Sequence, residues 1–423
     1  MLYLLIFYFL FFSYLAYKKT DWAIYLIVAA LPGYLIRFSI FGLPTTLLEM
    51  MILILFAVWL IKGNFSWARI KNNPFSWPIV AILIFSVISI FTSPNLIKAL
   101  GVWRAYFFEP LIFFFILTGR IKNPKQLYNI FWALGVSVFY LSAIAIWQKF
   151  SGWNVPLAFL NPDGSVDRVV SVFGYPNALG LYLGPIMILF TGFLRQKTKS
   201  SWPRIIKFLI ILLGLITILL AQSEAAIFTV VLIWFIWGML YKKTRLYFFL
   251  ILLAGVIIFF SNPLINYFII EKFTLQDYSG FIRRLIWGET WQMLKHNWLF
   301  GAGLAGYQTA IAKYHLPTFE IFLYPHNIFL NFWSELGLMG LISFLWLIIS
   351  FIGKNLKSMF TKVKSATGDF NIPINITLTF TIFEIIIHGL VDAPYFKNDL
   401  SILFWLIIGI FVINKNIKAG QKN

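Results

Sequence analysis

The chain has 423 residues, of which 60% are hydrophobic, 20% aromatic and only 12% charged. A soluble domain carries roughly 25% charged residues, so this composition excludes an ordinary water-exposed fold. The net charge of +19 is divided among small clusters between apolar runs, a pattern typical of membrane loops and not of a nucleic-acid-binding face. With zero cysteines, the chain can form neither a disulfide nor a thiolate nucleophile.

Apolar runs long enough to cross a bilayer recur along the whole sequence. We therefore predict an all-α polytopic integral membrane protein, a single transmembrane domain over residues 1–423 with about 12 to 14 transmembrane helices. The predicted spans are Leu2–Tyr17, Trp22–Ile36, Leu47–Ile61, Ile79–Thr92, Val102–Thr118, Leu127–Trp147, Ala178–Leu194, Ile205–Ala221, Ala225–Tyr241, Leu246–Phe260, Ile328–Phe351, Ile376–Leu390 and Ser401–Ile413.

Most basic residues fall in one alternating set of connections. By the positive-inside rule this side is predicted to be cytoplasmic, which puts the N-terminus outside and the C-terminus inside a cytoplasmic (inner) membrane. The set comprises Lys18, Lys19, Lys62, Arg69, Lys71, Arg120, Lys122, Lys125, Arg195, Lys197, Lys199, Arg204, Lys207, Lys242, Lys243, Arg245, Lys354, Lys357, Lys362, Lys364, Lys415, Lys418 and Lys422.

Two long connections, residues 148–177 and 261–327, are predicted to lie on the extracytoplasmic side. Arg168 in the first loop, and Arg283 and Arg284 in the second, stand against the charge bias of that side. Such residues can simply extend toward lipid headgroups, or their guanidinium groups can bind phosphate in bidentate fashion. Within the second loop, the pattern from Gly280 to Leu299 predicts a short amphipathic helix at the membrane interface.

The segment from Tyr324 to Gly340 carries the most informative residues. Asn327 is a good cap for the span that follows, so His326 is predicted to lie at a helix N-terminus on the outer side. The helix dipole there favours a neutral imidazole, which can accept a proton. Asn327, Asn331 and Glu335 recur at a spacing of four and predict a polar stripe that faces the protein interior.

Two glycines follow in the same segment, Gly337 and Gly340, and these predict close approach of a neighbouring helix. Together with His326-Asn327 they form a pattern that resembles the signature of the O-antigen ligase and O-antigen polymerase superfamily. The remaining similar stretches are Arg168 followed by Phe173, Pro176 and Asn177; Arg284-Leu-Ile-Trp287; Trp298-Leu-Phe-Gly-Ala-Gly-Leu; and His388-Gly-Leu-Val-Asp392.

The resemblance covers the chain from about Arg168 onward, with two departures. Where the family usually shows Ser-Arg-Gly, this chain has Ser223-Glu224-Ala225, so an acid replaces an expected cation. The family's ligase motif Arg-x-x-x-Leu is met by neither Arg283 nor Arg284. Ligase and polymerase therefore both stay open.

The resemblance implies an inverting, metal-independent glycosyltransferase. Its donor would be a glycan on polyprenyl (undecaprenyl) diphosphate, and its acceptor a hydroxyl of a glycan, lipid or protein, at the outer face of the membrane. In that reading His326 is the general base, and Arg168, Arg284 and Arg283 hold the diphosphate. The supporting residues would be Asn327, Glu335, His388, Asp392 and Asn177.

Two alternatives stay open beside this reading: a transporter or flippase of the lipid-linked glycan, and a protein O-oligosaccharyltransferase. Transporters often show internal repeats and broken spans around a midplane site, and the sequence shows neither clearly. We expect membrane lipids as partners, and no nucleic acid, cofactor or metal. Gly301-Ala-Gly303-Leu-Ala-Gly306 fits a dinucleotide fingerprint by letters but lacks the strand before it, so we predict a tight turn.

A last pattern lies near the C-terminal end of the chain. Glu384, His388 and Asp392 recur at a spacing of four, which allows a metal site but favours a buried polar stripe that pairs with an arginine elsewhere.

Overall fold

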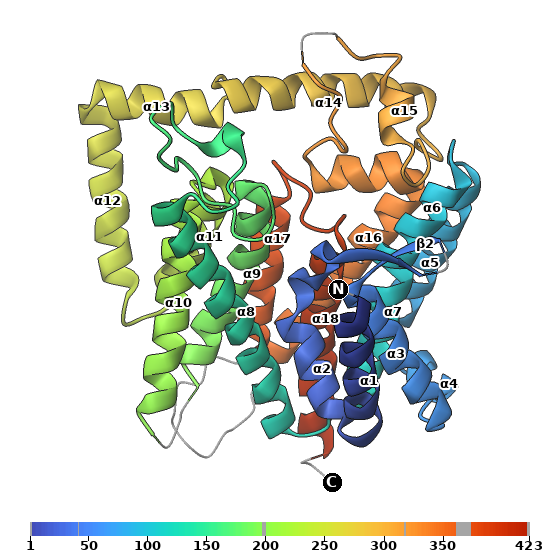
Figure 1. Cartoon of the computed structure of the whole chain (residues 1–423). Coiled ribbons are helices and arrows are strands. Elements are labelled where there is room, and N and C mark those ends of the chain that lie inside the picture. Colours follow the sequence, from blue (N-terminus) through green and yellow to red (C-terminus); the bar gives the residue numbers. More distant parts are fainter. Residues whose placement is uncertain (1, 41, 197–199, 317–318, 361–373, 421–423) are drawn as a thin grey trace.

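The computed structural model describes residues 2–40, 42–196, 200–316, 319–360 and 374–420. The described chain is mostly helical with almost no sheet and forms one bundle (Figure 1), so the predicted all-α class is confirmed. Its α-helices are α1 (Leu2–Lys18), α2 (Thr20–Ala29), α3 (Leu47–Ile61), α4 (Trp67–Lys71), α5 (Ser76–Phe91), α6 (Leu96–Trp103), α7 (Glu109–Arg120), α8 (Pro124–Ser151), α9 (Pro176–Leu194), α10 (Trp202–Leu220), α11 (Glu224–Leu240), α12 (Arg245–Ser261), α13 (Pro263–Phe273), α14 (Tyr278–His296), α15 (Tyr307–Ile311), α16 (Ile328–Phe360), α17 (Ile374–His388) and α18 (Asn398–Gly420).

Six of the described helices are long and apolar enough to cross a membrane, or seven if the bent pair α12 and α13–α14 counts as one span. Six shorter apolar helices coincide with further predicted spans. The multi-pass character of the protein is thus supported, whereas the expected number of 12 to 14 exceeds what helix length alone establishes. The six long helices are Leu96–Arg120, Pro124–Ser151, Pro176–Leu194, Trp202–Leu220, Ile328–Lys357 and Asn398–Ala419.

The bundle has two ends with different contents (Figure 1). We call the end that carries the 152–175 connection, α13 and α14 the loop end. The opposite end, which we call the basic end, carries the connections from α1 to α2 and from α7 to α8, together with the C-terminus. The cytoplasmic assignment of the basic end stays a prediction. Of the basic residues on which it rests, Lys197, Lys199, Lys362, Lys364 and Lys422 lie outside the described residues.

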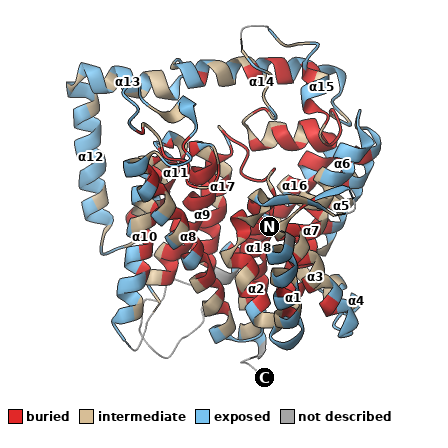
Figure 2. Cartoon of the chain, viewed as in Figure 1, coloured by how far each residue is buried: buried red, intermediate tan, exposed pale blue. Residues whose placement is uncertain are grey.

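The centre of the bundle is built around α9 and α18, which are the most buried of the long helices (Figure 2). Helix α9 packs against α10, α11 and α17, while α18 packs mainly against α7. Apolar side chains cover these two helices on nearly all sides, as expected for spans that do not face lipid.

Helices α12, α13 and α14 form a separate arm. No residue of α12 is buried, and the helix stands at the edge of the bundle with its apolar side chains exposed (Figure 2). At its end the chain bends by 102° into α13 and α14, which run across the loop end (Figure 1). The predicted amphipathic helix Gly280–Leu299 is therefore present as α14, and α13 is an addition that the sequence pattern had not indicated.

Near the N-terminus, short irregular elements connect α2 to α3 at the loop end. The 3₁₀ helix η1 (Leu31–Leu35) is followed by an antiparallel hairpin of β1 (Arg37–Ile40) and β2 (Leu43–Thr46). Helix α3 then begins with a capping box, in which Thr46 Oγ1 accepts from the Glu49 amide and the Glu49 carboxylate accepts from the Thr46 amide.

Between α6 and α7 the chain makes one π-helical turn, η2 (Arg104–Phe108). Arg104 pairs there with two carboxylates, that of Glu49 at 3.0 Å and that of Glu109 at 3.3 Å. Both η1 and η2 pack against α18, so irregular backbone from two distant parts of the sequence meets at the start of one central helix.

The predicted span Ile328–Phe351 is not a continuous helix. Gly337 has φ 74° and ψ 178°, so α16 breaks there into a short first part and a long second part. The Leu338 amide donates to the Leu299 carbonyl at 3.1 Å, and the Ala302 amide donates to the Ser334 carbonyl at 2.6 Å. The glycine is needed for its backbone conformation as well as for close packing, because this region of φ favours a residue without Cβ.

Candidate functional site

His326 lies at the loop end, immediately before α16. Asn327 caps the helix as predicted: its Oδ1 accepts from the amides of Phe329 at 3.0 Å and Leu330 at 3.1 Å. Its Nδ2 donates to the Leu390 carbonyl at 3.0 Å, which ties this turn to the end of α17. His326 itself has φ 48°, a left-handed conformation that is uncommon outside glycine and costs of order 1–3 kcal/mol.

A carboxylate orients the imidazole of His326. Its Nδ1 lies 3.2 Å from Asp392 Oδ1, and Asp392 is almost fully buried. Burial raises the pKa of Asp392, but the hydrogen bond and charge of His326, with smaller effects from His388 and the Ala393 amide, outweigh burial and hold that pKa well below its usual range. An ionised carboxylate only accepts, so Nδ1 carries a proton in either charge state of the imidazole, and in the neutral state Nε2 has a lone pair for a substrate.

The three residues spaced by four near the C-terminus do not form one stripe. Helix α17 ends at His388, and His388 Nδ1 lies 3.2 Å from Glu384 Oε1 inside the bundle. Thr229 Oγ1 donates to the same Glu384 oxygen at 3.1 Å. Asp392 lies beyond the helix end and faces His326 instead. All three residues are buried as predicted, but no arginine pairs with them among the described residues: outside the set, their side-chain partners are Thr229 and His326.

Helix α14 holds the turn of His326 from the other side. Trp287 Nε1 donates to the Pro325 carbonyl at 2.9 Å, and Arg283 Nε donates to the Val391 carbonyl at 2.9 Å. These two side chains are four residues apart and so share one helix face. One face of α14 thus contacts the residue before His326 and the residue before Asp392, which fixes the imidazole and its carboxylate relative to each other.

Arg284, the next residue, differs from Arg283. Its side chain is exposed, and it makes no hydrogen bond or ion pair with any part of the chain that the structure describes. Its guanidinium carbon lies 6.0 Å from the centre of the Phe281 ring, a cation–π distance. All five N–H donors of Arg284 are therefore available to a ligand.

Arg168 is held by the protein itself. Its Nε donates to the Ala221 carbonyl at 2.9 Å, and its Nη2 donates to Asn177 Oδ1 at 3.0 Å and to the Gln222 carbonyl at 3.1 Å. These carbonyls follow the last residue of α10, so the cation caps a helix C-terminus. Burial lowers the pKa of Arg168. Arg168 and Asn177, each predicted to belong to the site, contact each other, but no described contact joins either residue to His326.

Glu335 binds a backbone amide of a nearby turn and does not contact His326 in the part of the chain that the structure describes. Its Oε2 accepts from the Ala305 amide at 2.6 Å, within the glycine-rich turn that resembled a nucleotide fingerprint. Gly301 and Gly303 both have positive φ in that turn, which leads into α15. The predicted tight turn is therefore present. Asn331 and Glu335 are buried, as expected for a stripe that faces the interior.

Two residues with contacts at the loop end, Lys272 and Trp287, were not predicted from the sequence. Lys272 on α13 pairs with Glu224 at 2.8 Å and with Asp277 at 3.0 Å, so a cation from another helix lies beside the acid that departs from the family pattern. No local signal could reveal a pair that is 48 residues apart in sequence. Trp287 could have been found, because its spacing of four from Arg283 was readable.

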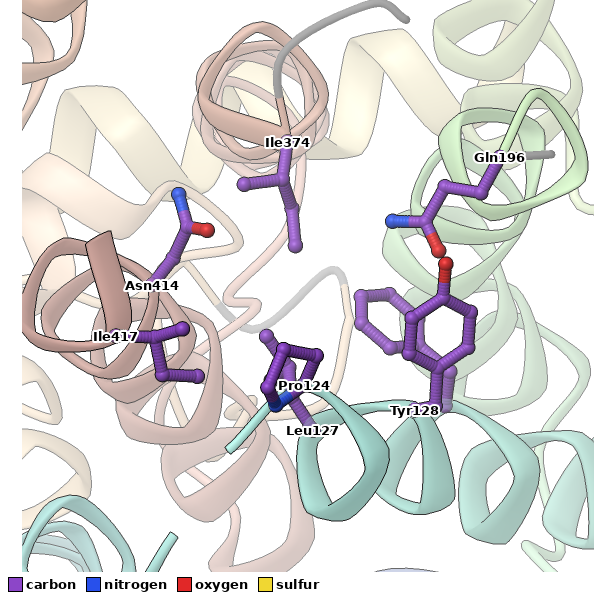
Figure 3. Close-up of a pocket in the computed structure, with 8 residues that line it drawn as sticks. Pro124, Leu127, Tyr128, Gln196, Ile374, Asn414 and Ile417 are labelled. Carbon is purple, nitrogen blue, oxygen red and sulfur yellow. The ribbon is translucent and has the colours of Figure 1, made fainter. Parts of the chain in front are cut away.

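Within the described residues no group of three or more His, Cys, Asp or Glu side chains could hold a metal ion. Two cavities lie at the basic end, away from His326. One of about 110 Å³ has no charged residue in its wall (Figure 3); it is lined by Pro124, Leu127, Tyr128, Phe131, Gln196, Ile374, Asn414 and Ile417. The other, of about 360 Å³, is lined by Lys18, Lys19, Asp21, Trp22, Tyr25, Arg120, Asn123, Lys125, Gln126 and Asn129.

The fold and the site define a class of protein: a multi-pass helical membrane protein with a histidine–carboxylate pair fixed beneath an arm at one end of the bundle. Residues 208–345 match the family model described as O-antigen ligase (Wzy_C), which confirms the resemblance to the ligase and polymerase superfamily. The match includes Arg283, Arg284 and His326 and ends before Asp392. No curated protein matches the chain.

Proposed function

We propose that the protein transfers or polymerises glycan from a polyprenyl-diphosphate-linked donor onto an acceptor hydroxyl at the outer face of the cytoplasmic membrane. The observation that carries the proposal is the His326–Asp392 pair, which leaves Nε2 free within a segment that matches the O-antigen ligase family model. A neutral imidazole oriented by a carboxylate is a group suited to take a proton from a hydroxyl.

The chemistry follows from that arrangement. His326 Nε2 takes the proton of the acceptor hydroxyl as its oxygen attacks the anomeric carbon of the donor sugar. The new glycosidic bond forms while the bond to the diphosphate oxygen breaks, and the leaving polyprenyl diphosphate keeps the electron pair. Direct displacement inverts the anomeric centre. Asp392 stabilises the imidazolium that forms, and general-base catalysis of this kind contributes roughly a hundredfold to ten-thousandfold.

Positive charge near the leaving group completes the proposal. Arg284 has all its donors free, and Arg283 uses only Nε on the Val391 carbonyl, so both can bind diphosphate oxygens. Arg168 has Nη1 unused by described residues and can add a third contact. One well-placed donor at such a site is worth about 2.7 to 4 kcal/mol of barrier. The ligase, polymerase and protein O-oligosaccharyltransferase readings differ in the acceptor alone.

The test is reconstitution of the purified protein in liposomes with lipid-linked glycan extracted from cells that lack it. We expect a new glycosidic bond and release of polyprenyl diphosphate, with the rate unchanged by EDTA. Movement of the lipid across the bilayer without any new bond would instead support a transporter. Mass analysis of surface glycans from the same cells separates the remaining readings: loss of chain length indicates a polymerase, and loss of attachment indicates a ligase.

A further inference from the structure

The larger cavity at the basic end, of about 360 Å³, has a strongly cationic wall. Lys18 and Lys19 reach it from the end of α1, and Arg120 and Lys125 reach it from the end of α7 and the start of α8. Asp21 is the one acidic residue among the described residues that line it. We call this cavity the basic pocket. Its excess of positive charge, in a volume within the usual range of ligand sites, indicates an anionic ligand.

The carboxylate of Asp21 is already bound by groups of the protein. Arg120 Nε pairs with Asp21 Oδ1, and Gln126 Nε2 donates to Asp21 Oδ2 at 2.8 Å. These contacts join α2 to α7 and α8 and so hold two sides of the basic pocket together. They leave the two Nη atoms of Arg120 without a hydrogen bond to any described residue, and its side chain is half exposed.

The three lysines of the basic pocket carry charge that no described carboxylate neutralises. The side chains of Lys18, Lys19 and Lys125 are exposed and make no hydrogen bond or ion pair in the part of the chain that the structure describes. The start of α8, which Asn123 caps, lines the same cavity. The positive end of the helix dipole therefore adds to the charge of the lysines.

An exposed apolar surface leads along α1 to the basic pocket. Phe7, Phe11 and Tyr14 are exposed and recur at spacings of three or four residues, and Lys18 continues the same helix face. Trp22, which is also exposed, lines the pocket beside the lysines. Tryptophan is typical of the level at which lipid headgroups meet the hydrocarbon of a membrane. A molecule in the basic pocket can thus contact cations at one end and apolar side chains at the other.

This combination suits the phosphate of an anionic lipid. The free Nη atoms of Arg120 can bind two phosphate oxygens, and the ammonium groups add point charges. Pockets of this kind between membrane helices are typical binding places for anionic headgroups. A free phosphate ion would use the cations but not the apolar face of α1, whereas the acyl chains of a lipid use both.

We infer that the basic pocket binds the phosphate-bearing headgroup of an anionic phospholipid, whose acyl chains lie along the exposed apolar face of α1. This inference does not depend on the proposed function, because the basic pocket and His326 lie at opposite ends of the bundle. The bound headgroup contacts residues from α1, α7 and α8 at once, so the lipid stabilises the folded protein.

The experiment measures lipid binding to the full chain in neutral detergent by native mass spectrometry. Phosphatidylglycerol is the anionic probe and phosphatidylcholine the zwitterionic one. We expect the unmutated protein to bind phosphatidylglycerol about tenfold more tightly than phosphatidylcholine. The double variant Lys19→Gln/Lys125→Gln is expected to bind phosphatidylglycerol about tenfold more weakly and phosphatidylcholine as before. Its melting temperature without added lipid should stay that of the unmutated protein, because both side chains are exposed.

A matched control removes the same charge elsewhere. Lys242→Gln/Lys243→Gln changes two exposed lysines in the connection from α11 to α12, outside the basic pocket, and is expected to bind both lipids as the unmutated protein does. An equal loss of phosphatidylglycerol binding in the two double variants would overturn the inference, since it would show general attraction to positive charge. Equal affinity of the unmutated protein for the two lipids would also overturn it.

Inorganic phosphate, added at the concentration of the lipid, distinguishes the two sources of a phosphate group. We expect it to leave the binding of phosphatidylglycerol unchanged, because it lacks acyl chains to contact α1. Displacement of phosphatidylglycerol by inorganic phosphate would show that the ligand is a free phosphate and would refute the assignment to a lipid.

Discussion

His326 and Arg168 differ in how many of their side-chain nitrogens are bound by other groups of the protein. His326 has Nδ1 bound to Asp392 and Nε2 without a partner among the described residues, and its backbone adopts a strained left-handed conformation. Arg168 uses two of its three side-chain nitrogens in hydrogen bonds to the Ala221 and Gln222 carbonyls and to Asn177. These bonds cap the C-terminus of α10. Both residues lie in loops that are predicted to be extracytoplasmic and to carry chemistry, yet their contacts indicate different roles.

The difference shows how a reactive group can be told from a structural one. A group that acts on a substrate needs a partner that orients it and a free atom that reacts, as His326 has. A group whose hydrogen-bond donors are bound to backbone carbonyls mainly stabilises the fold. It can bind a ligand only through donors that these carbonyls do not occupy. Arg284 resembles His326 in this respect, because its donors are free, whereas Arg283 and Arg168 lie between the two extremes.

The largest difference between the two regions is expected between the variants Arg284→Ala and Arg168→Ala. Arg284→Ala is expected to lower the rate of glycan transfer by about a hundredfold to a thousandfold, because a free diphosphate donor is lost. Its melting temperature should stay that of the unmutated protein. Initial rates in proteoliposomes and thermal unfolding in detergent measure the two effects. Full transfer by Arg284→Ala would remove this residue from the site.

A smaller effect is expected at the carboxylate. Asp392→Asn keeps an oxygen that can accept from Nδ1 but removes the charge that stabilises an imidazolium, so transfer should fall by about tenfold to a hundredfold. The measured quantity is kcat, with the donor KM unchanged. Asn177→Ala beside Arg168 is the comparison variant, and a loss of kcat in that variant equal to the loss in Asp392→Asn would erase the distinction between the two regions.

Arg168→Ala should act mainly on stability. Removing it leaves the carbonyls of Ala221 and Gln222 without their donor, and hydrogen bonds to a charged group are worth about 1.5–3 kcal/mol each. We expect a lower melting temperature, and restoration by Arg168→Lys of no more than part of it, since lysine cannot reach several acceptors in one plane. If the melting temperature of Arg168→Ala is unchanged and transfer is abolished, the main role of Arg168 is to bind a ligand and not to stabilise the fold.

The smallest effect concerns pH and the loop before His326. His315 lies 3.2 Å from Glu289 on α14; burial lowers the pKa of His315, but its bonds to Glu289 and to the Phe319 carbonyl raise it above the ordinary 6.5. The contact is therefore fully present below pH 6.5 and is lost as pH rises through the raised pKa.

Hydrogen exchange of the Leu316 amide, which donates to Glu289 at 2.9 Å, measures this effect after correction for the intrinsic exchange rate. Its protection should fall a few-fold with rising pH and should be independent of pH in His315→Gln. A pH-independent protection in the unmutated protein would show that His315 does not attach this loop to α14.

The helices were largely predictable because lipid-facing and buried spans are apolar on every side, a signal that needs no tertiary information. Leu47–Ile61 begins and ends as predicted. The break at Gly337 was not predicted, because it depends on backbone hydrogen bonds from residues near 300 that only the folded chain brings close. The hairpin of Arg37–Ile40 and Leu43–Thr46 was missed for a different reason: its strands are only four residues each, too short for a clear alternating pattern.

At the site, the sequence identified His326 through its place before a capped helix and its motif. It could not pair His326 with Asp392, since the two are 66 residues apart and a spacing of four suggested a different set. It also could not separate Arg283 from Arg284, because adjacent positions on a helix point in different directions that depend on what the helix contacts.

The most direct test is the initial rate of glycosidic bond formation by His326→Ala in proteoliposomes, measured with and without added imidazole. We predict a rate at least about a hundredfold below that of the unmutated protein, and an increase in proportion to the concentration of neutral imidazole, which replaces the missing base. A His326→Ala protein that transfers glycan at the full rate without imidazole would contradict the account.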